Sequence, residues 1–325
     1  MVDAMARRVL LLCWCARALV APPTQRGRTP TLRRSAPLEE VVRRKLDAVP
    51  GLHSKHATLA DSDVRARLAF AATDGGYRFS EAMRRGAGED GGARRVAVVF
   101  DVKRTSPHGG RDGGARPIAA FGDAGGIAAE AYSNWPVDAL CVAADGLAYG
   151  GSDADVAAAR AAAPTAPLLY KDVIVDPIQV AIAADLGADA VLLIAVVLGG
   201  SLQACLDACT IAGVEAAVEC HTPNEVAFAL EAGATLLVCT NRDRTTGELH
   251  TGQALGLRAL APPNVVCIAT GGVADEAEAR ALALAGYDGI LLGRALLEDP
   301  DGGKRLVAAI RDIELTPLDL LGLAL

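Results

Sequence analysis

The sequence has few aromatic residues, no excess of positive charge and no dinucleotide fingerprint. Aromatic side chains make up only 4% of the 325 residues. The core must therefore be built from Ala, Val, Leu and Ile, which suits parallel strands covered by helices. The formal net charge of -7 argues against a nucleic-acid partner. No G-x-G-x-x-G turn follows the first apolar strand, which argues against a dinucleotide-binding fold.

Paired cysteine motifs are also missing. None of the eight cysteines forms a C-x-x-C pair or another spacing typical of metal ligands. Cys141, Cys239 and Cys267 lie inside apolar runs, where a reduced, buried thiol is the expected state. We therefore expect no metal site and a reducing compartment.

The first 36 residues differ in composition from the rest of the chain. They hold seven arginines and a single acidic residue, Asp3. An apolar run at residues 9–21, interrupted by Arg17, is too short to span a bilayer and resembles the apolar part of a signal peptide. The Arg-, Ser-, Thr- and Pro-rich stretch after it resembles a transit peptide. We expect residues 1–36 to be a targeting leader, disordered or cleaved.

A signal followed by a transit segment resembles the two-part leaders of plastid proteins in algae with complex plastids. We therefore expect a plastid (chloroplast) location. A mitochondrial leader and a disordered extension on a cytoplasmic protein are the alternatives. No other segment is expected to be long and apolar enough for a membrane helix, so we expect no membrane partner for the mature chain.

Strand-like and helix-like segments alternate along most of the chain. Residues 37–94 read as a polar helical extension that ends in a Gly-rich linker. The strands are expected near 96–102, 139–142, 168–170, 190–194, 216–218, 235–239, 265–269 and 289–292. The helices are expected near 123–134, 153–162, 177–186, 202–212, 223–232, 253–260, 275–285 and 303–313.

Eight such units predict an α/β fold, a (β/α)8 TIM barrel over residues 95–315 with an N-terminal helical extension and a C-terminal tail at 316–325. An open, doubly wound sheet is the alternative. Thr222, Pro223 and Glu225 predict a capping box with proline in the first helical position. Four glycines stand just past expected helix ends, where a left-handed residue is favoured: Gly187, Gly213, Gly233 and Gly286.

Charged residues stand where several of the apolar strands stop. Asp101 and Lys103 are two residues apart and point to one face of the first strand. Lys171 ends the third strand and Glu219 ends the fifth. The carboxyl-terminal ends of all strands meet at one face of a barrel, so these groups are expected to converge there. Two neighbouring ammonium groups lower each other's pKa, which suits acid catalysis; salt bridges that close the barrel end are the alternative.

The last three strands add polar and glycine-rich ends to the same face. Gly-rich turns after the seventh and eighth strands of a barrel expose backbone N–H groups to phosphate. The residues expected at these ends are Thr240, Asn241, Arg242, Thr270, Gly271, Gly272, Gly293 and Arg294. His221 follows Glu219 by two residues and is read as a polar loop residue.

Several longer motifs appear in a fixed order. Asp101-Val102-Lys103 precedes a Ser106-Pro107-His108-Gly109 loop, and Tyr149-Gly150-Gly151-Ser152 follows the second strand. The third strand continues as Leu169-Tyr170-Lys171-Asp172-Val173-Ile174-Val175-Asp176-Pro177-Ile178-Gln179. Together with Val218-Glu219-Cys220-His221 and Asn241-Arg242-Asp243, these motifs resemble the indole-3-glycerol phosphate synthase family of tryptophan biosynthesis, from about residue 38 to 299.

The resemblance implies a decarboxylating ring closure without a cofactor. The substrate would be 1-(2-carboxyphenylamino)-1-deoxyribulose 5-phosphate. By this resemblance, Lys171 is the general acid on the ribulose carbonyl oxygen, Glu219 acts as base or stabilises the iminium, and Lys103 contacts the substrate's carboxylate or phosphate. Phosphate would be held by Ser106, Gly271, Gly272, Gly293 and the backbone N–H of Arg294, and Arg242 would orient the anthranilate part.

The chain departs from the family pattern at four positions. Asp101 replaces a longer Glu, Thr240 replaces an Asn, Ala269 replaces a Glu and Val173 replaces a Phe. These changes keep open a non-catalytic or regulatory paralogue that retains the phosphate site, and a barrel lyase or isomerase acting on another sugar phosphate. The partner we expect is the phosphorylated small-molecule substrate; a monomer and an association with other tryptophan-pathway enzymes both remain open.

Overall fold

The computed structural model describes residues 36–56, 78–85, 95–106, 116–117, 123–243 and 248–315. Except for Ala36, the predicted leader lies outside this part of the chain, as do the Gly-rich linker at 86–94, the loop residues Pro107, His108 and Gly109, and the predicted tail. The predictions made for those segments stay predictions.

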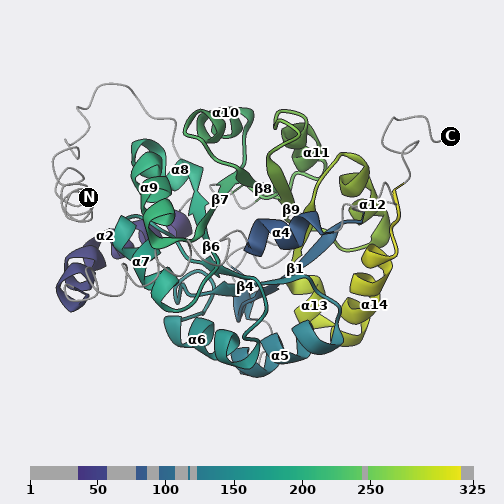
Figure 1. The fold of residues 1–325 in the computed structure, drawn as a ribbon, viewed down its shortest axis with the longest axis horizontal. Coiled ribbons are helices and arrows are strands. Elements are labelled where there is room, and N and C mark those ends of the chain that lie inside the picture. The colour runs from purple at the N-terminus through teal and green to yellow at the C-terminus, as the bar shows by residue number, and fades with distance from the viewer. Residues whose placement is uncertain are drawn as a thin grey trace.

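Eight parallel strands form a closed barrel in the order β1-β10-β9-β8-β7-β6-β5-β4 (Figure 1). The strands are β1 (Ala97–Val102), β4 (Ala139–Ala143), β5 (Leu168–Lys171), β6 (Ala190–Ile194), β7 (Glu215–Cys220), β8 (Leu236–Thr240), β9 (Val266–Thr270) and β10 (Gly289–Leu292). A short antiparallel pair, β2 (Thr105–Ser106) and β3 (Arg116–Pro117), stands apart from the barrel. The predicted (β/α)8 TIM barrel is confirmed, and the open sheet is excluded.

Helices cover the outside of the barrel. They are α5 (Ala124–Asn134), α6 (Asp153–Ala162), α7 (Pro177–Asp185), α8 (Ala195–Leu198), η1 (Gly199–Ser201), α9 (Leu202–Ala212), α10 (Pro223–Glu231), α11 (Gln253–Arg258), α12 (Glu276–Leu284), α13 (Arg294–Glu298) and α14 (Pro300–Arg311). All eight predicted helices are present; α8, η1 and α13 are additional. Short helices such as these lack the long periodic pattern by which a helix is recognised in sequence.

The side chains of each strand alternate between two apolar layers. Val98, Phe100 and Val102 of β1 pack outward against the helices, while Ala97 and Val99 pack inside the barrel. Both faces are covered, which explains why the strands are continuous apolar runs rather than alternating ones. The same alternation decides which polar residues at the strand ends face the barrel interior.

The helix signals are largely confirmed. Thr222 caps α10 by accepting a hydrogen bond from the backbone N–H of Glu225. The capping box predicted there is incomplete. It requires the Glu225 side chain to accept the backbone N–H of Thr222, whereas a Glu225 carboxylate oxygen accepts the backbone N–H of His221 at 3.1 Å. A complete capping box instead begins α7, between Asp176 and Gln179. The four predicted helix-end glycines have φ between 68° and 95°, the left-handed region.

The described helical stretch at 195–212 is long and apolar enough, by length and composition, to cross a membrane. The expectation that no such segment exists is therefore wrong. It failed because α8 and η1, which extend α9 toward the N-terminus, carry no recognisable helix signal. The stretch is interrupted at Gly199, where φ is 47°, and its inner residues, including Leu202, Cys205 and Cys209, belong to the core around the barrel.

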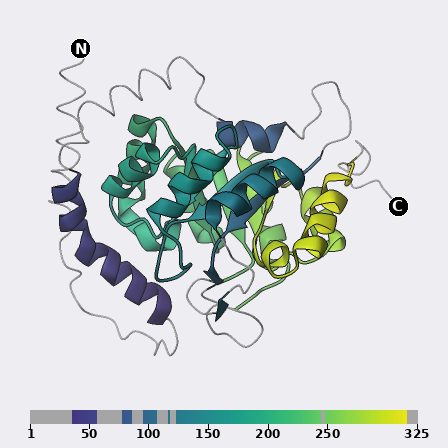
Figure 2. The same cartoon turned by 90° about the horizontal axis from the view of Figure 1, so that it is seen from below.

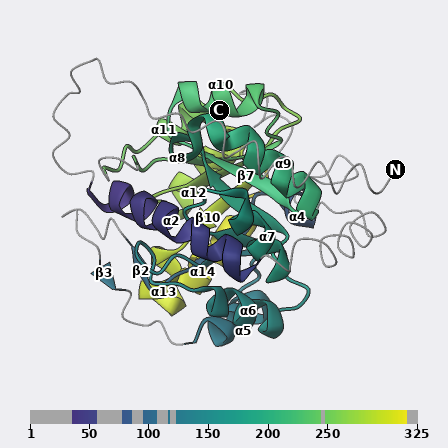
Figure 3. The same ribbon diagram turned by 90° about the vertical axis from the view of Figure 1, so that its left-hand side faces the viewer.

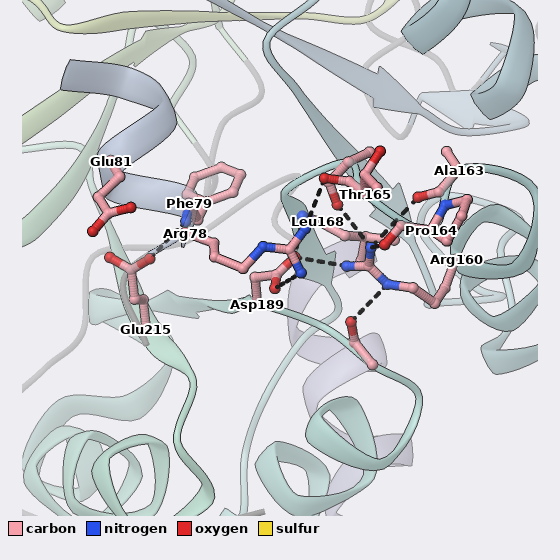
Figure 4. A network of polar contacts seen from close by, with 12 residues as sticks. Arg78, Phe79, Glu81, Arg160, Ala163, Pro164, Thr165, Leu168, Asp189 and Glu215 are labelled. Atoms are coloured by element: carbon pink, nitrogen blue, oxygen red, sulfur yellow. Dashed lines mark hydrogen bonds and ion pairs between the residues drawn. The ribbon is translucent and has the colours of Figure 1, made fainter. Parts of the chain in front are cut away.

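A helix ahead of the barrel, α4 (Arg78–Arg84), closes one end of it. Its Phe79 and Met83 are fully buried among the inward-facing residues of the strands. The backbone N–H groups of Phe79 and Ser80 donate to one carboxylate oxygen of Glu215, the first residue of β7 (Figure 4). Because Glu215 stands at the amino end of its strand, α4 plugs the amino-terminal end of the barrel. In Figures 2 and 3 it lies on the side opposite to β2 and β3.

The same end carries a second polar network around Asp189, just before β6 (Figure 4). Its Oδ2 accepts hydrogen bonds from Arg160 at 2.6 Å and from the backbone N–H of Leu168 at 2.8 Å. Arg78 of α4 lies 3.3 Å from the other oxygen and also donates to the carbonyl of Thr165. This network ties α4 to the strands and leaves the carboxyl-terminal end of the barrel for the candidate site.

Another helix, α2 (Ala36–Lys55), contacts α7 at the side of the barrel (Figure 3). Its Val41 packs with Val173 after β5 and with Ile194 at the end of β6. These contacts place α2 against the carboxyl-terminal ends of the strands.

Candidate active site

The inward-facing positions at the strand ends hold most of the predicted site residues. Asp101 and Lys103 continue the inward series that starts with Ala97 and Val99 of β1. Lys171 lies two residues after the inward-facing Leu169, and Glu219 lies two residues after the inward-facing Ala217, so both face inward as well. Thr240, Thr270 and Gly293 follow Val238, Ile268 and Leu291 in the same way. The barrel therefore turns seven predicted site residues toward its interior at the carboxyl-terminal end.

Two amines share one buried carboxylate at the centre of this end. Oδ2 of Asp101 accepts a hydrogen bond from Nζ of Lys171 at 2.9 Å, and it also accepts one from Nζ of Lys103. Burial raises the pKa of Asp101, but the two ammonium groups outweigh it and lower that pKa to about 2. Burial lowers the pKa of Lys103, and the charge of Lys171 adds to this, although Asp101 opposes both. The shorter Asp101 thus still reaches both lysines.

Gly293, which follows β10, packs directly against this cluster. A Cβ atom at this position would lie 2.9 Å from Nζ of Lys103 and 3.0 Å from Oδ2 of Asp101. Only glycine lets the backbone come so close without moving the pair. The carbonyl of Gly293 also accepts the N–H groups of Leu296 and Leu297, which starts α13.

The aromatic ring of Tyr149 completes the surroundings of Lys171. Its centroid lies 4.6 Å from Nζ of Lys171, within range of a cation–π interaction. The carbonyl of Tyr149 accepts the backbone N–H groups of Arg104 and Thr105, which joins the loops after β4 and β1. A Cβ on Gly151 would lie 1.9 Å from the carbonyl oxygen of Ala143, so the Tyr-Gly-Gly-Ser turn requires glycine there.

Glu219 contacts a histidine that the sequence motifs did not assign to the site. Nε2 of His221 lies 3.1 Å from Oε1 of Glu219, and Nδ1 lies 2.9 Å from Oε2 of Glu225. His221 lies in the loop between β7 and α10, as predicted, but it is buried, with 5% of its surface exposed. The spacing of two residues indicated that His221 lies on the same side of the chain as Glu219, because residues i and i+2 share a strand face.

The ends of β8 and β9 are joined by side-chain hydrogen bonds. Nδ2 of Asn241 donates to the carbonyl of Gly271 at 3.2 Å, and its Oδ1 accepts the N–H of Ala254 at 2.8 Å. The hydroxyl of Thr240 accepts the N–H of Arg242 at 3.0 Å. The Asn241 amide therefore holds the Gly-rich turn against α11.

Gly271 and Gly272 have φ of 93° and 80°, the left-handed region that favours glycine. They line a small cavity together with Asn241 and with residues of α11 and α12. Thr270, just before them, donates its hydroxyl hydrogen to the carbonyl of Leu291 at 3.3 Å. This is the turn at which the sequence places phosphate.

The remaining predicted residues lie at the same end. Arg294 begins α13, and its Nε lies 3.6 Å from Glu298. Arg242 forms an isolated bridge with Leu249 in the loop after β8. Ser106 forms the short strand β2, where it pairs with Arg116; its side chain lies outside the described residues. The roles assigned to these residues stay predictions.

In the described ranges, no group of three His, Cys, Asp or Glu side chains could hold a metal ion. The six described cysteines are buried thiols: Cys141, Cys205, Cys209, Cys220, Cys239 and Cys267. Burial raises the pKa of five of them, Cys141, Cys205, Cys209, Cys220 and Cys239, to about 12 for Cys205 and about 11 for Cys239. These cysteines are packing residues.

Two of the four departures from the family pattern occupy packing positions. Ala269 belongs to the outer layer between the strands and the helices. Val173 packs with Val41 of α2 and with Ile194. The barrel interior around Asp101, Lys103 and Lys171 is built without either side chain.

The fold and site define a (β/α)8 barrel with a buried acid–base cluster at its carboxyl-terminal end. Residues 38–309 match the family model "Indole-3-glycerol phosphate synthase". The chain is 34% identical to the indole-3-glycerol phosphate synthase of Carboxydothermus hydrogenoformans over 71% of this chain and 85% of the relative. It is 39% identical to indole-3-glycerol phosphate synthase 2 of Streptomyces coelicolor over 64% of this chain and 78% of the relative. This chain belongs to the indole-3-glycerol phosphate synthase family.

Solved structures support the fold alone. The barrel resembles the crystal structure of 3-hexulose-6-phosphate synthase from Salmonella typhimurium, with a TM-score of 0.52 and 16% identity. The match covers 70% of this chain and all of that one.

Proposed function

We propose that this chain is an indole-3-glycerol phosphate synthase, a carboxy-lyase of tryptophan biosynthesis. It converts 1-(2-carboxyphenylamino)-1-deoxyribulose 5-phosphate into indole-3-glycerol phosphate, carbon dioxide and water. The family membership supports this reaction, and one observation carries it in the site. Lys171 and Lys103 share the carboxylate of Asp101 in a buried cluster at the barrel mouth.

In this proposal Lys171 is the general acid. It protonates the ribulose carbonyl oxygen while a ring carbon of the anthranilate part attacks the carbonyl carbon. Loss of carbon dioxide from that ring carbon and loss of water then give the indole. The neighbouring charge of Lys103 favours proton release from such a cluster, because two ammonium groups close together repel each other.

Glu219 acts as the base or stabilises the iminium that precedes decarboxylation, and Lys103 binds the carboxylate or phosphate of the substrate. Backbone N–H groups at Gly271, Gly272, Gly293 and Arg294, with Ser106, hold the phosphate. Left-handed glycines after β9 and a helix start after β10 are features on which barrels bind phosphate. Arg242 orients the anthranilate part.

The test is turnover by the purified full chain, followed by the fluorescence of the indole product. We expect activity in the wild type and none in Lys171→Ala. That variant should keep its fold, because Lys103 still neutralises the buried Asp101. Full activity in Lys171→Ala would overturn the role of Lys171.

A non-catalytic paralogue is the second candidate, favoured by Thr240 in place of the family's Asn. Binding of a phosphate ligand without turnover in the wild type would establish it.

We also propose that residues 1–36 direct the chain to a plastid. Seven arginines and one acidic residue in this segment support a leader rather than part of the fold. A fluorescent protein fused after residue 36 should enter plastids; cytoplasmic or mitochondrial fluorescence would contradict the proposal.

A further inference from the structure

One lysine lies on the packed face of α2. The side chains of α2 that turn toward the barrel follow the i, i+3, i+4, i+7 pattern of one helix face, at Leu38, Val41, Val42 and Lys45. The first three belong to one apolar cluster with residues that follow β4 and β5, with the last residue of β6 and with α8. Lys45 continues this series with a charge where the helical pattern calls for an apolar residue. A lysine in this position needs a partner on the barrel.

Lys45 has two partners, both buried carboxylates. Its Nζ lies 2.5 Å from Oδ1 of Asp172 and 3.3 Å from Oδ2 of Asp145. The side chains of Asp172 and Asp145 are 5% and 1% exposed, while that of Lys45 is 20% exposed. Burial acts to lower the pKa of Lys45, but the two carboxylates raise it above its usual value. The helix thus supplies the positive charge that two buried acids require.

Asp172 is the residue after Lys171, and its carboxylate is held on every side. Oδ1 accepts the backbone N–H of Val173 at 2.7 Å as well as the Lys45 ammonium. Oδ2 accepts from the Gln179 amide at 3.2 Å. The Lys45 contact therefore fixes the turn by which the chain leaves β5, directly beside the candidate general acid.

Asp145 lies in the turn after β4, which carries Tyr149 on the other side of Lys171. It follows β4, and its carboxylate accepts the backbone N–H of Ala148. Its carbonyl accepts the N–H groups of Tyr149 at 3.3 Å and Gly151 at 2.9 Å. This turn sets the position of Tyr149, whose ring lies 4.6 Å from Nζ of Lys171.

We propose that Lys45 is a positioning residue for Lys171: one ammonium on α2 clamps the two turns that flank the general acid of the proposed reaction. The inference rests on the proposed function. Lys45 does not touch the reacting atoms; it acts through Asp172 on the backbone beside Lys171 and through Asp145 on the ring over its amine. Lys45, 127 positions from Asp172 in sequence, thereby helps to hold the candidate general acid in place.

The test measures kcat and KM for three variants of the full chain. Lys45→Met keeps the length of the side chain and removes its charge. We expect kcat to fall by roughly tenfold to a hundredfold, because a shift of about 1 Å in a catalytic group costs up to this much. KM should stay within about threefold, since Lys45 is outside the phosphate-binding turns. Lys45→Arg restores the charge and should recover most of kcat.

The matched control is Arg44→Met, on the neighbouring position of the same helix. Arg44 pairs with Glu40 on the surface, where its side chain is 55% exposed. We expect its kcat and KM to equal those of the wild type. If Lys45→Met does not fold, Asp145→Asn loosens the same clamp while Lys45 and Asp172 remain paired, and its kcat should also fall.

The outcomes separate the two proposals. An active wild type whose kcat is unchanged by Lys45→Met, even with lower stability, overturns the positioning role and leaves the proposed function standing. Equal kcat losses in Lys45→Met and Lys45→Arg would also overturn it, as would wild-type kcat in Asp145→Asn where that variant is the one measured. A wild type without turnover overturns the proposed function and this inference with it.

Discussion

The imidazole of His221 is held between the carboxylates of Glu219 and Glu225, with Nε2 3.1 Å from Glu219 and Nδ1 2.9 Å from Glu225. Nδ1 makes a hydrogen bond with Glu225, and Nε2 lies in contact with Glu219. His221 therefore connects Glu219, near the end of β7, to Glu225 of α10. This contact holds the Glu219 carboxylate in place in the barrel mouth.

The first prediction concerns this contact. His221→Leu removes both ring nitrogens and their contacts with Glu219 and Glu225, and we expect kcat to fall by at least about tenfold because an oriented base contributes on the order of 10² or more. The milder Glu225→Gln keeps an acceptor for Nδ1 but removes the charge, so its loss should be smaller. Steady-state kinetics of both variants check the prediction.

Glu231→Gln is the matched control, since Glu231 ends the same helix as Glu225 and is exposed. It should behave as the wild type. Wild-type kcat in a folded His221→Leu would show that Glu219 does not depend on His221.

The second prediction concerns the close approach of Gly293. A methyl group there would stand 2.9 Å from Nζ of Lys103 and must displace the Asp101–Lys103 pair. We expect Gly293→Ala to reduce kcat/KM by roughly a hundredfold through misplacement of these groups. Gly256→Ala is the control, because a Cβ at Gly256 has nothing within 4 Å and lies in a helix, where alanine is favoured. Equal activities of the two variants would rule out the steric argument.

The barrel could be predicted from the sequence because its signals are local. Continuous apolar runs mark strands covered on both faces, and several strand ends carry a residue that a core would not tolerate, such as Lys171 or Glu219. Helix starts such as Asp123 and Ser152 have side-chain caps that can be read directly from the sequence. Strand boundaries are confirmed to within two residues for this reason.

The sequence predicted the site residues that stand at the ends of individual strands, but not the contacts between distant segments of the chain. The pairing of Lys45 with Asp145 and Asp172 joins residues a hundred or more positions apart, and no local pattern carries that information. The burial of His221 and its contacts were not predicted, because its two carboxylate partners come together only when β7 and α10 are placed. The outward side of Ala269 likewise became clear only from the register of β9 with its neighbours.

The third prediction concerns acid stability. Asp101 has a pKa of about 2 in the fold against 3.8 ordinarily, so its ionised form stabilises the protein. That contribution is complete above about pH 4 and is lost as the pH falls through about 2. It amounts to about 2 kcal/mol, because each tenfold change in proton affinity corresponds to about 1.4 kcal/mol. The unfolding free energies of wild type and Asp101→Asn, measured in urea, should therefore converge by about this amount between pH 5 and pH 2. A gap that stays constant or widens would contradict the assignment.

The last prediction concerns the plug at the opposite end of the barrel. Oε1 of Glu215 accepts the N–H groups of Phe79 and Ser80 at 2.9 and 3.0 Å, and so anchors the start of α4. Glu215→Ala leaves both donors without this acceptor, and we expect the free energy of unfolding to fall by about 2 kcal/mol. Glu81→Ala, on the exposed side of the same helix, should change it by less than about 0.5 kcal/mol. Urea unfolding of both variants measures the difference. Because α4 lies at the amino-terminal end of the strands, kcat of folded Glu215→Ala should equal that of the wild type, and a large loss of kcat at full stability would show that the plug also shapes the distant site.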